Sequence, residues 1–124
     1  MNDDDIAWMG VQELARRVRS RDVSALELTQ AMLRRIERLD PQLRAYVRTT
    51  PELALAQARA ADGALARGEA PGPLHGVPVA VKDLCWTAGI PTSAGMPIHA
   101  DFRPPVDGTV VRLDLQPGPP APLP

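Results

Sequence analysis

Leu74-His75-Gly76-Val77-Pro78-Val79-Ala80-Val81-Lys82-Asp83 is the stretch that decides how this chain is interpreted. It carries the only lysine among the 14 Lys and Arg residues of the sequence. Arginine stays protonated at ordinary pH, whereas a desolvated lysine can lose its proton and act as a base. A composition that merely favours arginine would also leave a single lysine. The interpretation of Lys82 therefore depends on the residues around it.

Those residues predict a strand followed by a loop. Val77, Val79 and Val81 alternate, and the residues between them are also apolar, which is typical of a strand covered on both faces. Pro78 fits best at the start or edge of such a strand, because it lacks a backbone donor. We therefore expect a strand over 77–81. The segment 88–95 has no regular pattern, which is typical of a functional or disordered loop.

The residues before this stretch predict helices. Ser24 and Glu27 have the spacing of a capping box, in which each side chain bonds the other residue's amide. Pro51 suits the first position of a further, Ala-rich helix, and Gly68 suits its end. The predicted elements are a helical stripe over 6–19, a helix that starts after Ser24 and ends at Asp40-Pro41, a short extended segment over 42–48, and a helix from Pro51 to Arg67.

The last part of the chain changes character. Asp107-Gly108-Thr109 could cap another helix that runs through Leu113. The final stretch is rich in proline, which fixes φ and removes backbone donors. We therefore expect one domain over 1–113, followed by a disordered Pro-rich tail over 114–124.

Composition excludes several classes of protein. The chain has 124 residues, enough for one small domain, and its formal net charge is −1, so it has no basic excess for nucleic-acid binding. A single cysteine, Cys85, excludes an internal disulfide and fits a reducing compartment. The acidic start is unlike a signal peptide, and no apolar run has membrane-span length. We expect a cytoplasmic protein without nucleic-acid or membrane partners, and the oligomeric state stays open.

Three spaced segments together resemble the N-terminal part of the amidase signature family. They are Gly72 to Asp83, then 88–95, and then Asp107 to Arg112, and the helical segments upstream also fit, so that the resemblance covers residues 6–112. It implies an α/β fold with helices around a mixed sheet, incomplete here. The resemblance ends at Arg112 inside a predicted helix, which is what a shifted reading frame or a premature end would produce.

The resemblance also implies a chemistry. In the family, the lysine matched by Lys82 is the base of a Ser–cis-Ser–Lys triad that transfers the acyl group of a small amide substrate and needs no cofactor. Both catalytic serines of the family lie downstream, in a Gly/Ser-rich stretch that this chain lacks. Its own serines are Ser20, Ser24 and Ser93, and we expect Ser93 to be a loop residue. The sequence therefore predicts an amidase-family fragment that is inactive alone. The alternative is a non-catalytic remnant or small binding module that retains the scaffold.

Other reactive side chains have simpler interpretations. His75 and His99 lie far apart, and no Cys or His stands at a metal-ligand spacing from either, so we expect no metal site. His75 belongs to the Leu-His-Gly turn and is expected to bond the backbone. Cys85 is expected to be a passive, small apolar residue.

Overall fold

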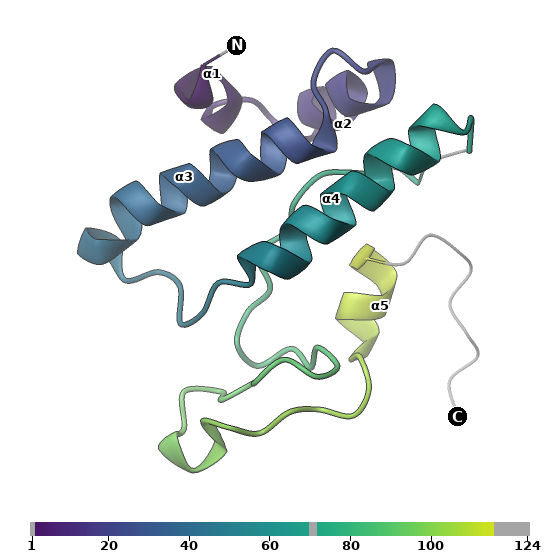
Figure 1. The fold of residues 1–124 in the computed structure, drawn as a ribbon. Helices are drawn as coiled ribbons and strands as arrows, with labels where there is room; N and C mark the ends of the chain where they lie inside the picture. Colours follow the sequence, from purple (N-terminus) through teal and green to yellow (C-terminus); the bar gives the residue numbers. More distant parts are fainter. Residues whose placement is uncertain (1, 70–71, 116–124) are drawn as a thin grey trace. The chain divides into compact units, whose positions relative to one another are not determined.

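The computed structural model describes residues 2–69 and 72–115, and the chain divides into two units, Met1–Val79 and Ala80–Pro124. Figure 1 shows the elements, which are mostly helical. They are α1 Asp3–Ala7, α2 Val11–Ser20, α3 Ala25–Leu43, α4 Pro51–Ala66, the 3-10 turn η1 Pro97–His99, and α5 Thr109–Leu115.

The first unit is built on α3 and α4, which pack side by side and run in opposite directions (Figure 1). The short helix α1 also packs on α3. Small and aliphatic side chains from all four helices form one core, which lets the helices approach closely. The buried members are Ile6, Val18, Val23, Ala25, Leu28, Ala31, Ala58 and Leu65.

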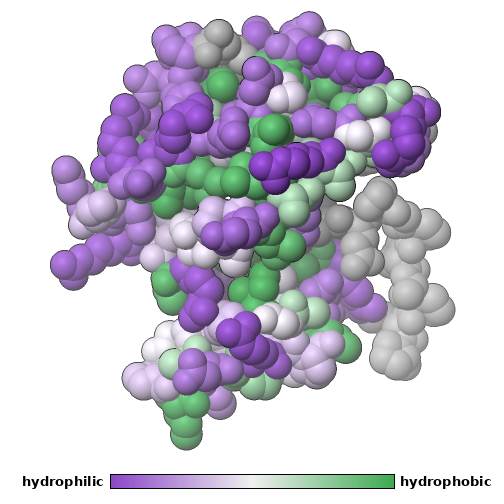
Figure 2. Space-filling view, in the orientation of Figure 1, coloured by the Kyte–Doolittle hydropathy of each residue, from purple (hydrophilic) through white to green (hydrophobic). Residues whose placement is uncertain are grey.

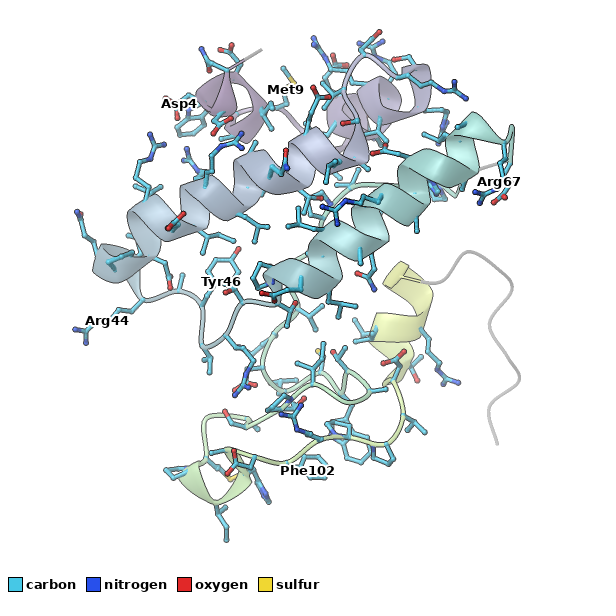
Figure 3. The ribbon with its side chains drawn as sticks, viewed as in Figure 1. Asp4, Met9, Arg44, Tyr46, Arg67 and Phe102 are labelled. Carbon is cyan, nitrogen blue, oxygen red and sulfur yellow. The ribbon has the colours of Figure 1, made fainter. Side chains whose placement is uncertain are left out.

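The helical stripe predicted over 6–19 is divided into two helices. α1 ends at Ala7, and Gly10 is the N-cap of α2. Ion pairs between α1 and α3 accompany the burial of Ile6: Asp3 pairs with Arg34, and Asp4 lies near Arg35 and Arg38. Figure 3 shows Asp4 beside the basic side chains of α3. The hydrogen bonds from Arg34 hold the pKa of Asp3 below its usual value.

The predicted capping box at the start of α3 is confirmed. The Glu27 amide donates to Ser24 Oγ over 3.0 Å, and the Ser24 amide donates to Glu27 Oε2 over 2.9 Å. The two remaining amides of the first turn, those of Ala25 and Leu26, donate to the carboxylate of Asp62 on α4 over 2.7 and 3.1 Å. Side chains thus satisfy the free donors of this turn, and one of them ties α3 to α4.

The end predicted for α3 at Asp40-Pro41 is wrong, because the helix continues to Leu43. Pro41 lies in the last turn, where the loss of one amide removes only one intrahelical bond. The carboxylate of Asp40 then accepts the amides of Ala45 and Tyr46 over 2.7 and 3.1 Å, which ends the helix beyond the proline. The segment predicted as extended over 42–48 therefore starts inside α3 and continues without a strand.

The prediction for α4 is confirmed at its start and is close at its end. Pro51 is the first residue, and the helix ends at Ala66, with Gly68 in the left-handed region at φ 76° just beyond it. The guanidinium of Arg21 also donates to the carbonyl of Leu65 in the last turn of α4. A cation there stabilises the carbonyl end of the helix.

The strand predicted over 77–81 is wrong for the described residues. No strand is present in residues 2–69 and 72–115, so the mixed sheet of the expected α/β fold is not seen, although the helices are. A strand needs a neighbour for its hydrogen-bond ladder, and Pro78 cannot donate to one. Val79 and Val81 remain 42% and 38% exposed.

The second unit contains irregular segments and α5. This helix starts at Thr109, as expected, and continues to Leu115, past the boundary predicted at 113. The rest of the predicted tail, 116–124, lies outside the described residues. Within residues 2–69 and 72–115, no helix is both long and apolar enough to cross a membrane. Figure 2 shows hydrophilic side chains over much of the visible face, with hydrophobic patches between them.

Candidate active site

The Leu-His-Gly turn, which precedes Lys82 in the sequence, is held on α4 by His75. The ring nitrogen Nε2 of His75 lies 2.8 Å from the carbonyl oxygen of Ala61 on α4. Since a carbonyl can only accept, Nε2 carries the proton that is donated. The prediction that His75 bonds the backbone is therefore confirmed.

The next residue, Gly76, occupies a position where any side chain would be strained. Its φ is +75°, and a Cβ at this position would lie 2.8 Å from Val18 Cγ1 and 2.9 Å from Ala25 Cβ. Val18 and Ala25 are fully buried core residues, so they have little room to move. The turn is therefore pressed directly against the core formed by α2 and α3.

Lys82 itself is exposed, and its backbone begins a tight turn. Its carbonyl oxygen accepts the amides of Leu84 and Cys85 over 2.7 and 2.9 Å. Within the described part of the chain, no hydrogen bond or ion pair engages the Lys82 amine. The side chain is thus exposed to water and has no hydrogen-bond partner among the described residues.

Asp83 joins the lysine-bearing segment to the loop that follows. Its carboxylate accepts the Ser93 amide over 3.0 Å and also the Ser93 hydroxyl, and its carbonyl accepts the Ala94 amide over 2.7 Å. The sequence does not predict this role of Asp83. The only available signal was an aspartate directly after Lys82, and nothing in the sequence pairs it with a serine ten positions later.

The three serines of the chain all form hydrogen bonds with groups other than the Lys82 amine. Ser20 Oγ donates to the Arg17 carbonyl and to Asp22, and Ser24 caps α3. Ser93 Oγ donates to Asp83 and accepts the Gly95 amide over 3.3 Å. The geometry agrees with the expectation that Ser93 is a loop residue, because its hydroxyl proton is directed to a carboxylate.

The loop over 88–95 is irregular, as expected, but it is hydrogen-bonded along its length. The amides of Gly89 and Thr92 donate to the carbonyls of Pro104 and Phe102 over 3.0 and 2.8 Å. Phe102, labelled in Figure 3, packs edge to face on Trp86 with ring centroids 5.6 Å apart. These contacts make a small framework around the turn that Lys82 begins.

The remaining candidates form no site. Asp107, expected to cap α5, accepts the Ala88 amide over 2.7 Å. Cys85 is a half-buried free thiol, and His99 is exposed beside Phe102. In residues 2–69 and 72–115, no three His, Cys, Asp or Glu side chains gather where they could hold a metal ion.

Comparison with known proteins identifies the family. Residues 27–118 match the Amidase family, which is more than half of the chain. The match includes the lysine-bearing segment and α3 from Glu27 onward. This chain belongs to the amidase family.

Individual relatives agree with this assignment. AmiD of Mycobacterium bovis, which bears the name putative amidase, is 52% identical to this chain over 111 residues. These residues are 90% of this chain and 23% of AmiD. A glutamyl-tRNA(Gln) amidotransferase subunit of Methylococcus capsulatus is 56% identical over 99 residues, which are 80% of this chain and 20% of that protein. The chain thus spans about a quarter or less of the curated relatives that it matches.

A solved structure shares the fold. It comes from a vestigial protein complex studied for the evolutionary origins of an s-triazine catabolic enzyme. Its TM-score is 0.79 at 35% identity, over 86% of this chain and 24% of that one. The helical arrangement seen here is therefore that of a quarter of a larger protein.

Removing the carboxylate of Asp83 is expected to loosen the loop without unfolding the helices. In Asp83→Ala, the amide of Ser93 loses its acceptor, and a hydrogen bond to a charged group contributes about 1.5–3 kcal/mol. We expect hydrogen exchange at Ser93 to accelerate by about tenfold or more, measured by NMR, with protection in α3 and α4 unchanged. Asp101→Ala is the matched control, because Asp101 is exposed. Equal exchange at Ser93 in both variants would contradict the role of Asp83.

Proposed function

We propose that this chain is the base-bearing N-terminal part of an amide-cleaving enzyme and that Lys82 is the base. The observation that carries the proposal is the position of the only lysine, at the start of a turn that the hydrogen bonds of Asp83 with Ser93 and Ala94 join to the following loop. Family membership supports the same reaction class. The substrate is a small-molecule amide, whose identity depends on pockets outside these residues.

The chemistry assigns one proton path to Lys82. A neutral amine takes a proton through a bridging serine, and a second serine then attacks the amide carbonyl carbon. The carbon–nitrogen bond breaks, the departing amine receives the proton back, and water hydrolyses the acyl-enzyme. Arginine could not perform the first step, because it does not release its proton at ordinary pH.

The geometry also supports the expectation that the chain is inactive alone. Each of its serines forms a structural hydrogen bond, and none of these bonds involves the Lys82 amine. Lys82 is exposed to water, whereas a lysine base needs a desolvating environment that favours the neutral amine. The nucleophile, the bridging serine and the cover over Lys82 must therefore come from other residues.

The purified 124-residue chain is accordingly expected to show no amide turnover above the uncatalysed rate. A base without a nucleophile or oxyanion donors supplies only a small part of the catalysis. Release of ammonia or amine from aliphatic and aromatic amides is the measurement. Turnover that disappears in Lys82→Arg would contradict the expectation and would show that the chain is complete.

A further inference from the structure

We propose that Asp83 is a positioning residue for Lys82, because it holds the backbone from which the lysine side chain extends. The inference rests on the proposed function of Lys82 as the base. It assigns Asp83 no contact with substrate and no proton transfer. All the residues that carry it belong to the second unit, 80–124.

Asp83 is held both at its side chain and at its backbone carbonyl. The carboxylate accepts the two donors of Ser93, the amide over 3.0 Å and the hydroxyl. The carbonyl accepts the amide of Ala94 over 2.7 Å. A charged acceptor forms stronger hydrogen bonds than a neutral one. Because two groups of one residue bond two consecutive residues, Asp83 is fixed against the loop in both position and orientation.

The part of the loop that Asp83 binds is itself constrained. Thr92, directly before Ser93, is buried, and its amide donates to the carbonyl of Phe102 over 2.8 Å. Ala94 has a left-handed backbone with φ 51°, which a residue with a Cβ keeps only where the surrounding structure holds it. Asp83 is therefore bonded to a fixed partner.

The bonds of Asp83 act on Lys82 through the peptide group that the two residues share. The carbonyl of this group, that of Lys82, accepts the amides of Leu84 and Cys85 over 2.7 and 2.9 Å. Those two bonds set the shape of the turn, and the bonds of Asp83 set its place on the loop. A catalytic group displaced by about 1 Å can lose about 10²-fold in rate, so this place affects catalysis.

Hydrogen exchange in the 124-residue chain tests the structural part of the proposal. In Asp83→Ala, we expect the amides of Leu84 and Cys85 to exchange about tenfold faster or more. Asp107→Ala is the matched control, because the carboxylate of Asp107 also accepts one amide of this unit, that of Ala88, over 2.7 Å. It leaves the bonds of Asp83 intact, so Leu84 and Cys85 should exchange as in the parent. Equal exchange at these two amides in all three proteins would overturn the proposal.

A chimera in which this chain replaces the matching segment of AmiD tests the catalytic part. We expect Asp83→Ala to lower kcat by about 10- to 100-fold with KM nearly unchanged, because a misplaced base affects the chemical step and not binding. Asp83→Asn keeps an oxygen that can accept the Ser93 amide, and it should recover most of kcat. If kcat of Asp83→Ala, per folded enzyme, is no lower than that of Asp107→Ala, the positioning role is wrong.

Ser93→Ala decides the matter if Asp83→Ala does not fold. This variant removes only the hydroxyl and keeps the amide that donates to Asp83. We expect a smaller effect in the same direction, about threefold or more in kcat and in exchange at Leu84 and Cys85. No change in either quantity would overturn the proposal.

Failure of this proposal can be distinguished from failure of the proposed function. A Lys82→Arg chimera as active as its parent would reject the proposed function, whatever hydrogen exchange shows at the turn. An inactive Lys82→Arg chimera, together with an Asp83→Ala variant that behaves like Asp107→Ala, would reject only the positioning role. If the parent chimera is itself inactive, hydrogen exchange at Leu84 and Cys85 decides alone.

Discussion

Gly76→Ala is expected to destabilise the helical unit by about 3 kcal/mol, from two additive causes. The left-handed backbone at φ +75° strains any residue with a Cβ. The new methyl group would also lie 2.8 Å from Val18 and 2.9 Å from Ala25, both of which are packed in the core. The free energy of unfolding, from urea denaturation followed by circular dichroism, measures the effect.

Gly68→Ala is the matched control for this variant. Gly68 has nearly the same φ, +76°, but a Cβ there meets no atom within 4 Å. It should therefore show only the backbone strain, about 1 kcal/mol. If the two variants lose the same stability, the close contact of the Leu-His-Gly turn with the core is not as described.

Features of the fold that depend on neighbouring residues could be predicted from the sequence. The capping box of Ser24 and Glu27, the proline that starts α4 and the glycine that follows it all act within one or two helical turns. Each supplies or removes a hydrogen bond or a backbone conformation locally. No information about the rest of the chain is needed to recognise them.

Features that depend on distant partners could not be predicted. The strand over 77–81 was expected from its alternating valines, but pairing requires a neighbouring strand that the described residues do not contain. The proline predicts an end of α3 at Asp40-Pro41, because it disfavours helix in the residue before it. The capping of later amides by the Asp40 side chain leaves no pattern in the sequence. Asp62, which closes the start of α3, lies 37 positions from Ala25.

The candidate site also has features that the sequence predicts and features that it does not predict. Lys82 was identifiable because it is the only lysine and because the residues around it resemble a known family. The hydrogen bonds of His75 with Ala61 and of Asp83 with Ser93 appear only in three dimensions. The sequence predicted that His75 would bond the backbone, but it did not reveal which carbonyl would accept.

Lys82→Arg is expected to remove nearly all amidase activity in a chimera in which this chain replaces the matching segment of AmiD. Guanidinium keeps the positive charge and much of the size of the lysine, but it cannot take the proton of a serine. The loss of a general base lowers the rate by about 10²–10⁴-fold. When several residues act as one catalytic unit, the removal of any one of them abolishes most of the catalysis. We therefore expect kcat/KM to fall by about 10³-fold or more, with little change in the melting temperature.

Arg48→Lys provides the control in the same chimera. Arg48 is exposed and lies in the connection between α3 and α4, so exchange of one cation for another there should leave both activity and stability unchanged. A loss of activity in this variant would mean that the chimera tolerates no cation exchange. The effect at Lys82 would then say nothing about proton transfer.

The most direct test of the account is kcat/KM of this chimera for a simple amide, measured across pH with Lys82 and with Lys82→Arg. The account predicts a chimera that cleaves the amide with Lys82 and a Lys82→Arg variant whose kcat/KM is lower by about 10³-fold or more at every pH measured. A Lys82→Arg variant within about threefold of the parent, with the same pH profile, would contradict the assignment of Lys82 as the base.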